Sequence, residues 1–251
     1  MQAVAIIILA GMSYAAVAAA SAGDPVRLTW DEGDVAGMST IYDSARREIG
    51  YIDYRQHRQG DRLTTVRVAR FRDGSSDEDS AEARVAGVLE TLSGRSIIRN
   101  ERGEVTVDIT IDVTAGRITA AWGTGSDRQT SDERVALPKG TYWGPLIFIV
   151  LKNFEANARD GRLEFRTVAP TPRPMVLDMA LTRRSTETLE RVGLHLDAER
   201  FDLTPTVHWA VDPIVRLIAP EAAFWMTPGA PPSLARFRGP RNYARQGIVI
   251  E

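Results

Sequence analysis

The 251-residue sequence contains no cysteine and only three histidines. The lack of cysteine excludes disulfides, thiolate metal sites, a cysteine nucleophile and a lipid-modified N-terminal cysteine. The histidines are His57, His195 and His208, and no two of them have the short spacing that brings a pair of zinc ligands together. We therefore expect no metal and no other cofactor.

Neither sign of charge dominates the chain. It holds 31 basic and 33 acidic residues, for a formal net charge of −2, and all the basic residues except Lys139 and Lys152 are arginine. A chain with this balance has no general attraction to the phosphate backbone. We therefore expect no nucleic-acid partner.

Recognisable catalytic motifs are also missing. The sequence has no G-x-S-x-G elbow and no phosphate-cradling glycine loop between a strand and a helix. The acidic stretch Asp73–Ser80 alternates oxygen ligands, but Glu78 and Arg84 stand where a calcium loop needs glycine and glutamate. We therefore interpret it as a polar hairpin loop. No catalytic residue is assigned, although a carboxylate pair on a β scaffold, in a hydrolase or isomerase, stays open as the alternative.

The first 22 residues carry no charged side chain and end in small residues. This pattern predicts a signal peptide over 1–22, with cleavage before Gly23 and, as the alternative site, before Ser21. The apolar stretch Ala3–Ala20 approaches the roughly 20 residues that span a bilayer, so an uncleaved N-terminal membrane anchor is the alternative. We expect residues 23–251 to form a single β-rich domain that is periplasmic or secreted.

Alternation of apolar and polar residues dominates the first half of this domain. In Val105–Val113 the odd positions are valine or isoleucine and the even positions are threonine or aspartate, which is typical of a strand with one buried face. Thr114–Gly116 then predicts a hairpin turn. The other expected strands are Glu48–Gln59, Arg62–Arg72, Glu82–Leu92 with Arg95–Asn100 after a break at Ser93–Gly94, Arg117–Trp122, Arg162–Val168, Met175–Leu181, Glu187–Leu196, Ala222–Thr227 and Leu234–Arg238.

One segment has the period of a helix instead. Pro145 suits the first turn of a helix, and apolar residues recur at steps of three and four as far as Ala158. We therefore predict a helix over Pro145–Ala158. A buried strand over Leu146–Leu151 is the alternative, because short apolar runs are ambiguous.

The order of these elements resembles an exported bacterial family of unknown function. The resemblance rests on Glu48–Tyr51, Asn100–Trp122, Leu137–Gly140 and Phe224–Met226. Such families are similar in architecture to the half-barrel lipoprotein carriers of the LolA type, whose curved sheet and helix enclose an apolar cavity. The resemblance implies a mainly β fold, with an antiparallel curved sheet or half-barrel and one inserted helix. It implies no catalytic residue.

Aromatic and methionine side chains gather around the expected helix and the later strands, and such side chains suit apolar ligands of irregular shape. We therefore predict an exported envelope protein that binds a lipid or another hydrophobic small molecule. Two alternatives stay open: the aromatic side chains form an ordinary core, or the chain is a structural envelope protein without a ligand. Another envelope protein is a possible partner. The predicted ligand-binding residues are Trp143, Phe148, Phe154, Met175, Met179 and Trp225.

Overall fold

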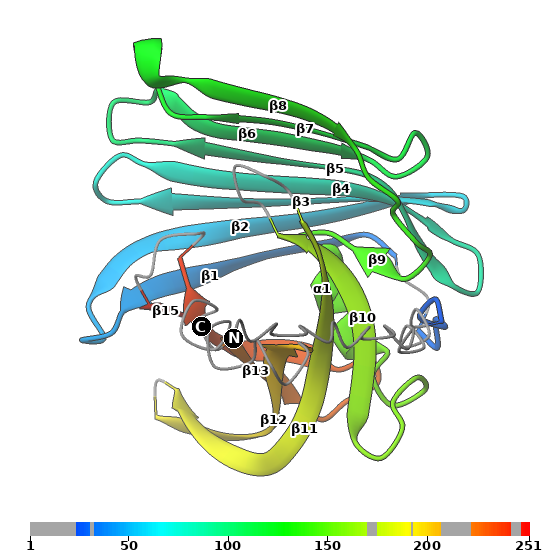
Figure 1. Ribbon diagram of the computed structural model, residues 1–251. Helices are drawn as coiled ribbons and strands as arrows, with labels where there is room; N and C mark the ends of the chain where they lie inside the picture. The colour runs from blue at the N-terminus through cyan, green and yellow to red at the C-terminus, as the bar shows by residue number, and fades with distance from the viewer. Residues whose placement is uncertain (1–23, 31–32, 170–174, 192, 207–221, 242–246) are drawn as a thin grey trace, which may run out of the picture.

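The computed structural model describes the chain except residues 1–23, 31–32, 170–174, 192, 207–221 and 242–246. The predicted signal peptide therefore lies outside the described residues. All the described strands belong to one 15-stranded sheet, which is antiparallel except for one edge pair (Figure 1). No helix in the described ranges is long and apolar enough to cross a membrane.

The first half of the sheet is a run of hairpins in sequence order. Turn glycines with a positive φ, such as Gly60 at +62° and Gly116 at +59°, connect neighbouring strands. The expected hairpin at Thr114–Gly116 is thus confirmed. The strands are β1 (Val35–Asp43), β2 (Glu48–Gln59), β3 (Arg62–Phe71), β4 (Ser76–Val85), β5 (Leu89–Arg99), β6 (Val105–Asp112), β7 (Arg117–Trp122) and β8 (Gln129–Arg134).

The second half consists of β9, which precedes the helix, and the strands that follow the helix, and it joins the first half through β15, which pairs with β1. Its strands are β9 (Thr141–Tyr142), β10 (Arg162–Ala169), β11 (Met175–Arg191), β12 (Leu194–Pro205), β13 (Ala222–Thr227), β14 (Ser233–Pro240) and β15 (Gly247–Ile250). The expected strand Glu187–Leu196 is wrong as a single element. Gly193, with φ +75°, lies at the turn between β11 and β12.

The predicted helix exists but is shorter than expected. Helix α1 spans Leu146–Lys152 and begins directly after Pro145, so the alternative of a buried strand is wrong. The helix ends at Asn153 because this side chain turns to another segment. Its Oδ1 accepts the backbone N–H groups of Thr29 at 2.7 Å and Trp30 at 3.3 Å. Asn157 likewise accepts the N–H of Arg27, so two asparagines fasten segment 24–30 across the end of α1.

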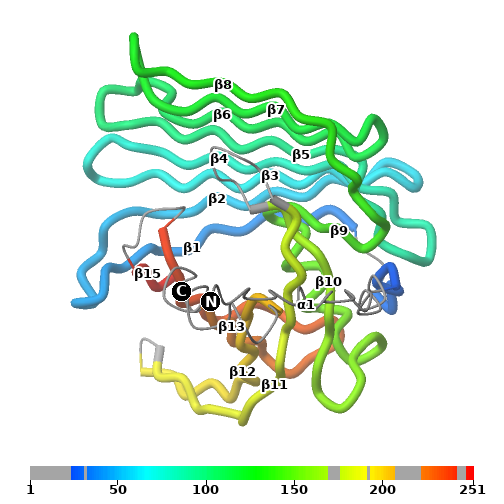
Figure 2. Tube along the Cα trace, in the orientation of Figure 1, coloured from blue at the N-terminus to red at the C-terminus, as the bar shows by residue number. Residues whose placement is uncertain are grey.

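The sheet curls but does not close. Its two edge strands are β8 and β9, and they do not pair with each other (Figure 2). The short strand β9 instead lies against β5, where the Thr91 hydroxyl donates to the carbonyl of Thr141 at 2.7 Å. The predicted fold class, a curved antiparallel sheet with one inserted helix, is confirmed.

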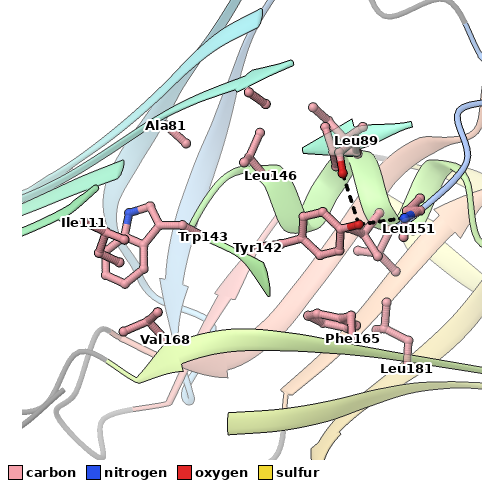
Figure 3. Packing of buried hydrophobic residues seen from close by; sticks show 14 of the residues in the cluster. Ala81, Leu89, Ile111, Tyr142, Trp143, Leu146, Leu151, Phe165, Val168 and Leu181 are labelled. Atoms are coloured by element: carbon pink, nitrogen blue, oxygen red, sulfur yellow. Dashed lines mark hydrogen bonds between the residues drawn. The ribbon is translucent and has the colours of Figure 1, made fainter. Parts of the chain in front are cut away.

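Helix α1 packs inside the curve of the sheet, and we call the side of the sheet that faces it the concave face. Leu146, Ile149 and Val150 are fully buried there against side chains from both halves of the sheet (Figure 3). Tyr142 is also fully buried. Its hydroxyl accepts the N–H of Val26 at 2.7 Å and donates to the carbonyl of Leu89 at 3.3 Å.

Strand β6 confirms the predicted alternation. Val107, Ile109 and Ile111 are buried in this core, whereas Asp108 and Asp112 lie on the opposite face. Val105, at the start of the strand, is only half-buried. The period of two in the sequence therefore identified the buried face of the central hairpin.

The interpretation of Asp73–Ser80 as a polar hairpin loop is wrong for its second half. Only its first residues form the turn, and Asp77 and Asp79 lie in β4 with their side chains on the concave face. Both residues are buried, at 6% and 7% exposure. The alternating aspartates are thus the inward positions of a strand.

Candidate functional site

A row of polar side chains crosses the concave face in the first half of the sheet. The strand register places Tyr54 of β2 opposite Arg67 of β3, Arg67 opposite Asp79 of β4, and Asp79 opposite Ser96 of β5. The next residue across is Ile109, which is fully buried in the core. We call Tyr54, Arg67, Asp79 and Ser96 the polar row.

An ion pair lies at the centre of the polar row. The Arg67 guanidinium donates from Nη2 to the Asp79 carboxylate, whose side chain is 10% exposed. The loop before α1 passes directly over this pair, because a Cβ at Gly144 would lie 3.5 Å from the Asp79 Cβ. Helix α1 therefore begins beside a buried carboxylate and its guanidinium partner.

A row of aromatic rings starts at Tyr54 and runs away from the polar row. The ring centroids of Tyr54 and Phe148 are 6.0 Å apart, those of Phe148 and Phe224 are 6.2 Å apart, and those of Phe224 and Phe237 are 5.0 Å apart. The first two contacts are edge-to-face, a favourable geometry for rings. We call these four residues the aromatic row. It links β2, α1, β13 and β14 across the inside of the curve.

The aromatic row is not fully covered by protein. Phe224 is buried at 4% exposure, but Tyr54, Phe148 and Phe237 are only half-buried. Half-buried rings inside a curved sheet present apolar surface to whatever enters it. An apolar molecule in contact with them would remove that surface from water.

The structure brings four of the six predicted ligand-binding residues to α1 and the strands around it. Trp143 and Phe154 are almost fully buried in the core, and the Phe154 ring lies 4.9 Å from the Phe201 ring. Phe148 and Met179 are half-buried against the same core. Met175 pairs with Ala169 at the start of β11, and its side chain is outside the described residues.

The indole of Trp143 is in an unusual position. It lies on the backbone of Gly94, and its Nε1 is buried without a hydrogen-bond partner among the described residues. In Figure 3 the indole extends along the core towards Ile111, away from Tyr142. Trp143 thus helps to fill the first half of the curve.

Trp225 lies apart from Trp143, Phe148, Phe154 and Met179. In β13, Phe224 and Met226 belong to the core around α1, so the alternation of a strand directs Trp225 to the opposite face. Its Nε1 donates to Glu187 at 2.7 Å. Three guanidinium groups lie 5.5 to 5.8 Å from its ring centroid, those of Arg200, Arg236 and Arg238. This tryptophan lies on the convex face among charged side chains and is not a neighbour of α1.

Two of the cavities formed by described residues contain none of the six predicted ligand-binding residues in their linings. One, of about 210 Å³, lies on the convex face over small side chains such as Thr119 and Ala121. The other, of about 330 Å³, lies between two hairpin turns and Arg241. By burial, Trp143 and Phe154 are core residues, whereas Phe148 is only half-buried.

Sequence reasoning missed the polar row and half of the aromatic row. Tyr54 and Arg67 stand an even number of residues from the buried residues of β2 and β3, so they lie on the same face. This spacing is the sequence signal that could have identified them. No group of three or more potential metal ligands occurs in the part of the chain that the structure describes. His57 is exposed, as expected, with its Nδ1 3.1 Å from Asp34.

Comparisons with known proteins add a likeness in shape. No protein-family model matches the chain, and no curated protein matches it. Among solved structures, the chain is similar to a beta-barrel-like protein of the domain of unknown function DUF1849 from Brucella abortus. The two share 9% sequence identity and a TM-score of 0.47, over 90% of this chain and 96% of that chain.

Proposed function

We propose that this protein is an exported protein of the cell envelope that binds a lipid or another elongated apolar ligand inside its curved sheet. The observation that carries the proposal is the aromatic row, in which Tyr54, Phe148 and Phe237 are half-buried on the concave face. Export is supported by the charge-free segment 1–22 and its small-residue end.

The aromatic row defines the line along which an elongated ligand would lie. One end is Tyr54, which neighbours Arg67, and the other is Phe237, which contacts a second core cluster around Ile41 and Phe71. An acyl chain laid along the four rings would have its binding driven by removal of apolar surface, at about 25 cal/mol per Å². Such binding depends little on salt, since screening acts on charges.

The unclosed sheet provides a route for entry. Strands β8 and β9 are edges that do not pair, so the two halves of the sheet are joined through β1 and β15 and through packing against α1. A small separation of the halves would uncover more of Phe148, because this residue lies between Tyr54 in the first half and Phe224 in the second. The proposal therefore needs no separate lid.

The alternative is a hydrolase or isomerase that uses the polar row. Asp79 lies opposite Ser96 and next to Arg67, so a carboxylate and a hydroxyl do converge on the concave face. The Asp79 carboxylate is occupied by the guanidinium of Arg67, however, and this ion pair favours a structural role. We therefore place binding ahead of catalysis.

Lipid analysis tests the binding proposal. The full chain, purified without detergent from the envelope of its native host, is extracted with organic solvent, and the extract is examined by mass spectrometry. We expect one class of lipid in near-stoichiometric amount. An extract without lipid, from protein that is folded by circular dichroism, would count against the proposal.

The same preparation tests export. Mass spectrometry of the intact protein should give an N-terminus at Gly23, because cleavage after an Ala-x-Ala pattern is expected there. Recovery of the chain with Met1 from the membrane fraction would support the anchored alternative. Recovery of the full-length chain from the cytosol would contradict both.

A further inference from the structure

The cavity of about 330 Å³ is separate from the aromatic row and has a different lining. It lies between the turn that joins β3 to β4 and the turn that joins β5 to β6. Arg241, which follows β14 directly, forms a third wall, so the cavity combines residues from both halves of the sheet. Its volume is at the lower end of the range of about 300–1,000 Å³ for small-molecule sites. It suits a headgroup-sized molecule.

A held guanidinium forms the inner wall. The Arg241 side chain is 14% exposed, and its guanidinium lies on the Phe71 ring and donates to the Ser75 hydroxyl. It is also 3.5 Å from the Asp73 carboxylate and 3.8 Å from that of Asp77. These contacts fix the guanidinium at a defined point of the wall before any ligand arrives, and the two carboxylates already balance its charge.

The outer wall carries charges of both signs. Arg99 lines the cavity from the end of β5, and Glu101 and Arg102 line it from the turn between β5 and β6. Arg99 donates to the carbonyl of Gly103 at 3.3 Å. In the described part of the chain, neither Glu101 nor Arg102 forms a side-chain ion pair, although they are adjacent in the sequence. Their charges are therefore available to a molecule in the cavity.

The lining thus combines three guanidinium groups with two carboxylates, those of Asp73 and Glu101. A dianion would be repelled by the carboxylates, and a simple cation would be repelled by the guanidinium groups. A molecule with one negative and one positive group satisfies both. Guanidinium groups match the geometry of phosphate oxygens, and a carboxylate accepts from an ammonium group.

We infer that this cavity binds a zwitterionic phosphodiester, with its phosphate towards Arg99, Arg102 and Arg241 and its ammonium group towards Glu101. The chemistry is that of an aminoethyl phosphate. It occurs both in soluble phosphodiesters and in the headgroups of zwitterionic lipids. The inference does not depend on the proposed lipid binding, because the cavity is formed without any residue of the aromatic row.

The test is a titration of the full chain with three soluble probes, followed by calorimetry or by NMR. Glycerophosphoethanolamine carries both charges, glycerophosphoglycerol carries the phosphate alone, and ethanolamine carries the ammonium group alone. We expect saturable binding of the first, at least fivefold weaker binding of the second and no binding of the third. Added salt should weaken the binding, in contrast to binding at the aromatic row.

Two exposed substitutions identify the site without disturbing the fold. Arg102→Gln should weaken glycerophosphoethanolamine at least fivefold. Glu101→Gln should remove the preference for the zwitterion over glycerophosphoglycerol. The control is Arg128→Gln, at an exposed arginine that does not line the cavity. Equal affinity of all three probes, absence of saturation, or variants that behave like the control would overturn the inference.

A fourth probe separates the two sources of the ligand. Lysophosphatidylethanolamine, used below the concentration at which it forms micelles, adds one acyl chain to the same headgroup. Binding that is at least tenfold tighter than that of glycerophosphoethanolamine and that Arg102→Gln weakens at least fivefold would assign the cavity to a lipid headgroup. Equal binding of the two probes, or tighter binding that Arg102→Gln leaves unchanged, would assign the cavity to a soluble phosphodiester. Failure of the proposed lipid binding would leave the response to the soluble probe intact.

Discussion

The indole of Trp143 lies flat against Gly94 of β5, so close that a Cβ at position 94 would be 2.4 Å from its Cδ1 and 2.7 Å from its Cγ. These are inner atoms of a buried ring rather than the end of a flexible chain. The bulky indole and the missing side chain therefore depend on each other. They determine how closely the loop before α1 approaches the sheet.

Gly94→Ala should therefore destabilise the protein by about 1–3 kcal/mol, the usual effect of forcing extra volume into a packed core. Chemical denaturation measures this. The control is Gly37→Ala in β1, where a Cβ would meet nothing within 4 Å. Equal midpoints for the two variants would show that Trp143 moves freely and does not pack on Gly94.

Tyr142→Phe should destabilise the protein at neutral pH by about 1–3 kcal/mol, because it leaves the N–H of Val26 and the carbonyl of Leu89 with one partner fewer. Burial also raises the pKa of Tyr142 to about 12. The unfolded chain ionises this phenol near pH 10, so the stability of the parent should fall between about pH 10 and pH 12.

The Tyr142→Phe variant has no phenol to ionise and so lacks this loss of stability. The difference in stability between the parent and the variant should therefore shrink over that pH range. Denaturation at several alkaline pH values measures the difference. Tyr51→Phe, at a side chain that is 43% exposed, is the control and should show no such convergence. A constant difference between parent and Tyr142→Phe would mean that the phenol reaches water in the folded state.

Asn153→Ala should release segment 24–30 from the end of α1. The change removes the acceptor of the Thr29 and Trp30 N–H groups and the donor to the carbonyl of Ile149, at a residue that is 1% exposed. Hydrogen exchange should show faster exchange of the Thr29 amide, and a loss of stability of about 1–3 kcal/mol is expected. Unchanged exchange at Thr29 would contradict the role of Asn153 as its anchor.

Glu251 directly follows β15 and forms two ion pairs, one with Arg46 in the turn between β1 and β2 at 2.8 Å and one with Arg236 in β14 at 2.5 Å. Burial alone would raise the pKa of Glu251, but hydrogen bonds and charge from these two arginines hold it below its ordinary value. A lowered pKa means that the stabilisation is complete above the unfolded pKa of about 4.3 and is lost as the pH falls below it.

Glu251→Gln should therefore cost about 1–2 kcal/mol at pH 7, and less as the pH falls from about 5 towards 3. Urea denaturation across that range measures the change. Glu48→Gln breaks an exposed ion pair with Arg72 and should cost under about 1 kcal/mol at any pH. A Glu251 deficit that stays constant down to pH 3 would exclude the proposed linkage.

The strands of the central hairpins could be predicted because their signals are local. Alternation identified Ile109 and Ile111 as buried, turn glycines such as Gly116 marked the hairpins, and the expected strand Ala222–Thr227 matches β13 residue for residue. Each of these signals acts over a few residues. A single sequence contains them in full.

The buried charges could not be predicted, because their partners are distant in the sequence. Asp77 and Asp79 were interpreted as a solvated loop, since nothing local to them offers a counter-charge. Their partners are Arg241 and Arg67, which the fold brings onto the same face. The helix is predicted too long for a similar reason. Asn153 ends it by binding a segment more than 100 residues away.

The candidate site was only partly accessible from the sequence. Clustering of aromatic residues identified Phe148, but it ignored the face on which each residue lies, so Trp225 was grouped with residues on the other side of its strand. Tyr54 and Phe237 are far from α1 in the sequence, and only the curl of the sheet brings them to Phe148 and Phe224. Contacts that depend on curvature cannot be read from periodicity.

The most direct test of the account is a titration of the delipidated full chain with cis-parinaric acid, a fluorescent fatty acid. We expect saturable binding that changes little with salt and that weakens roughly tenfold or more in Phe148→Ala, because a ring contact is lost. Met38→Ala, at a side chain that is 75% exposed outside the aromatic row, should bind like the parent. Absence of saturation, or equal affinity in the parent and Phe148→Ala, would contradict the account.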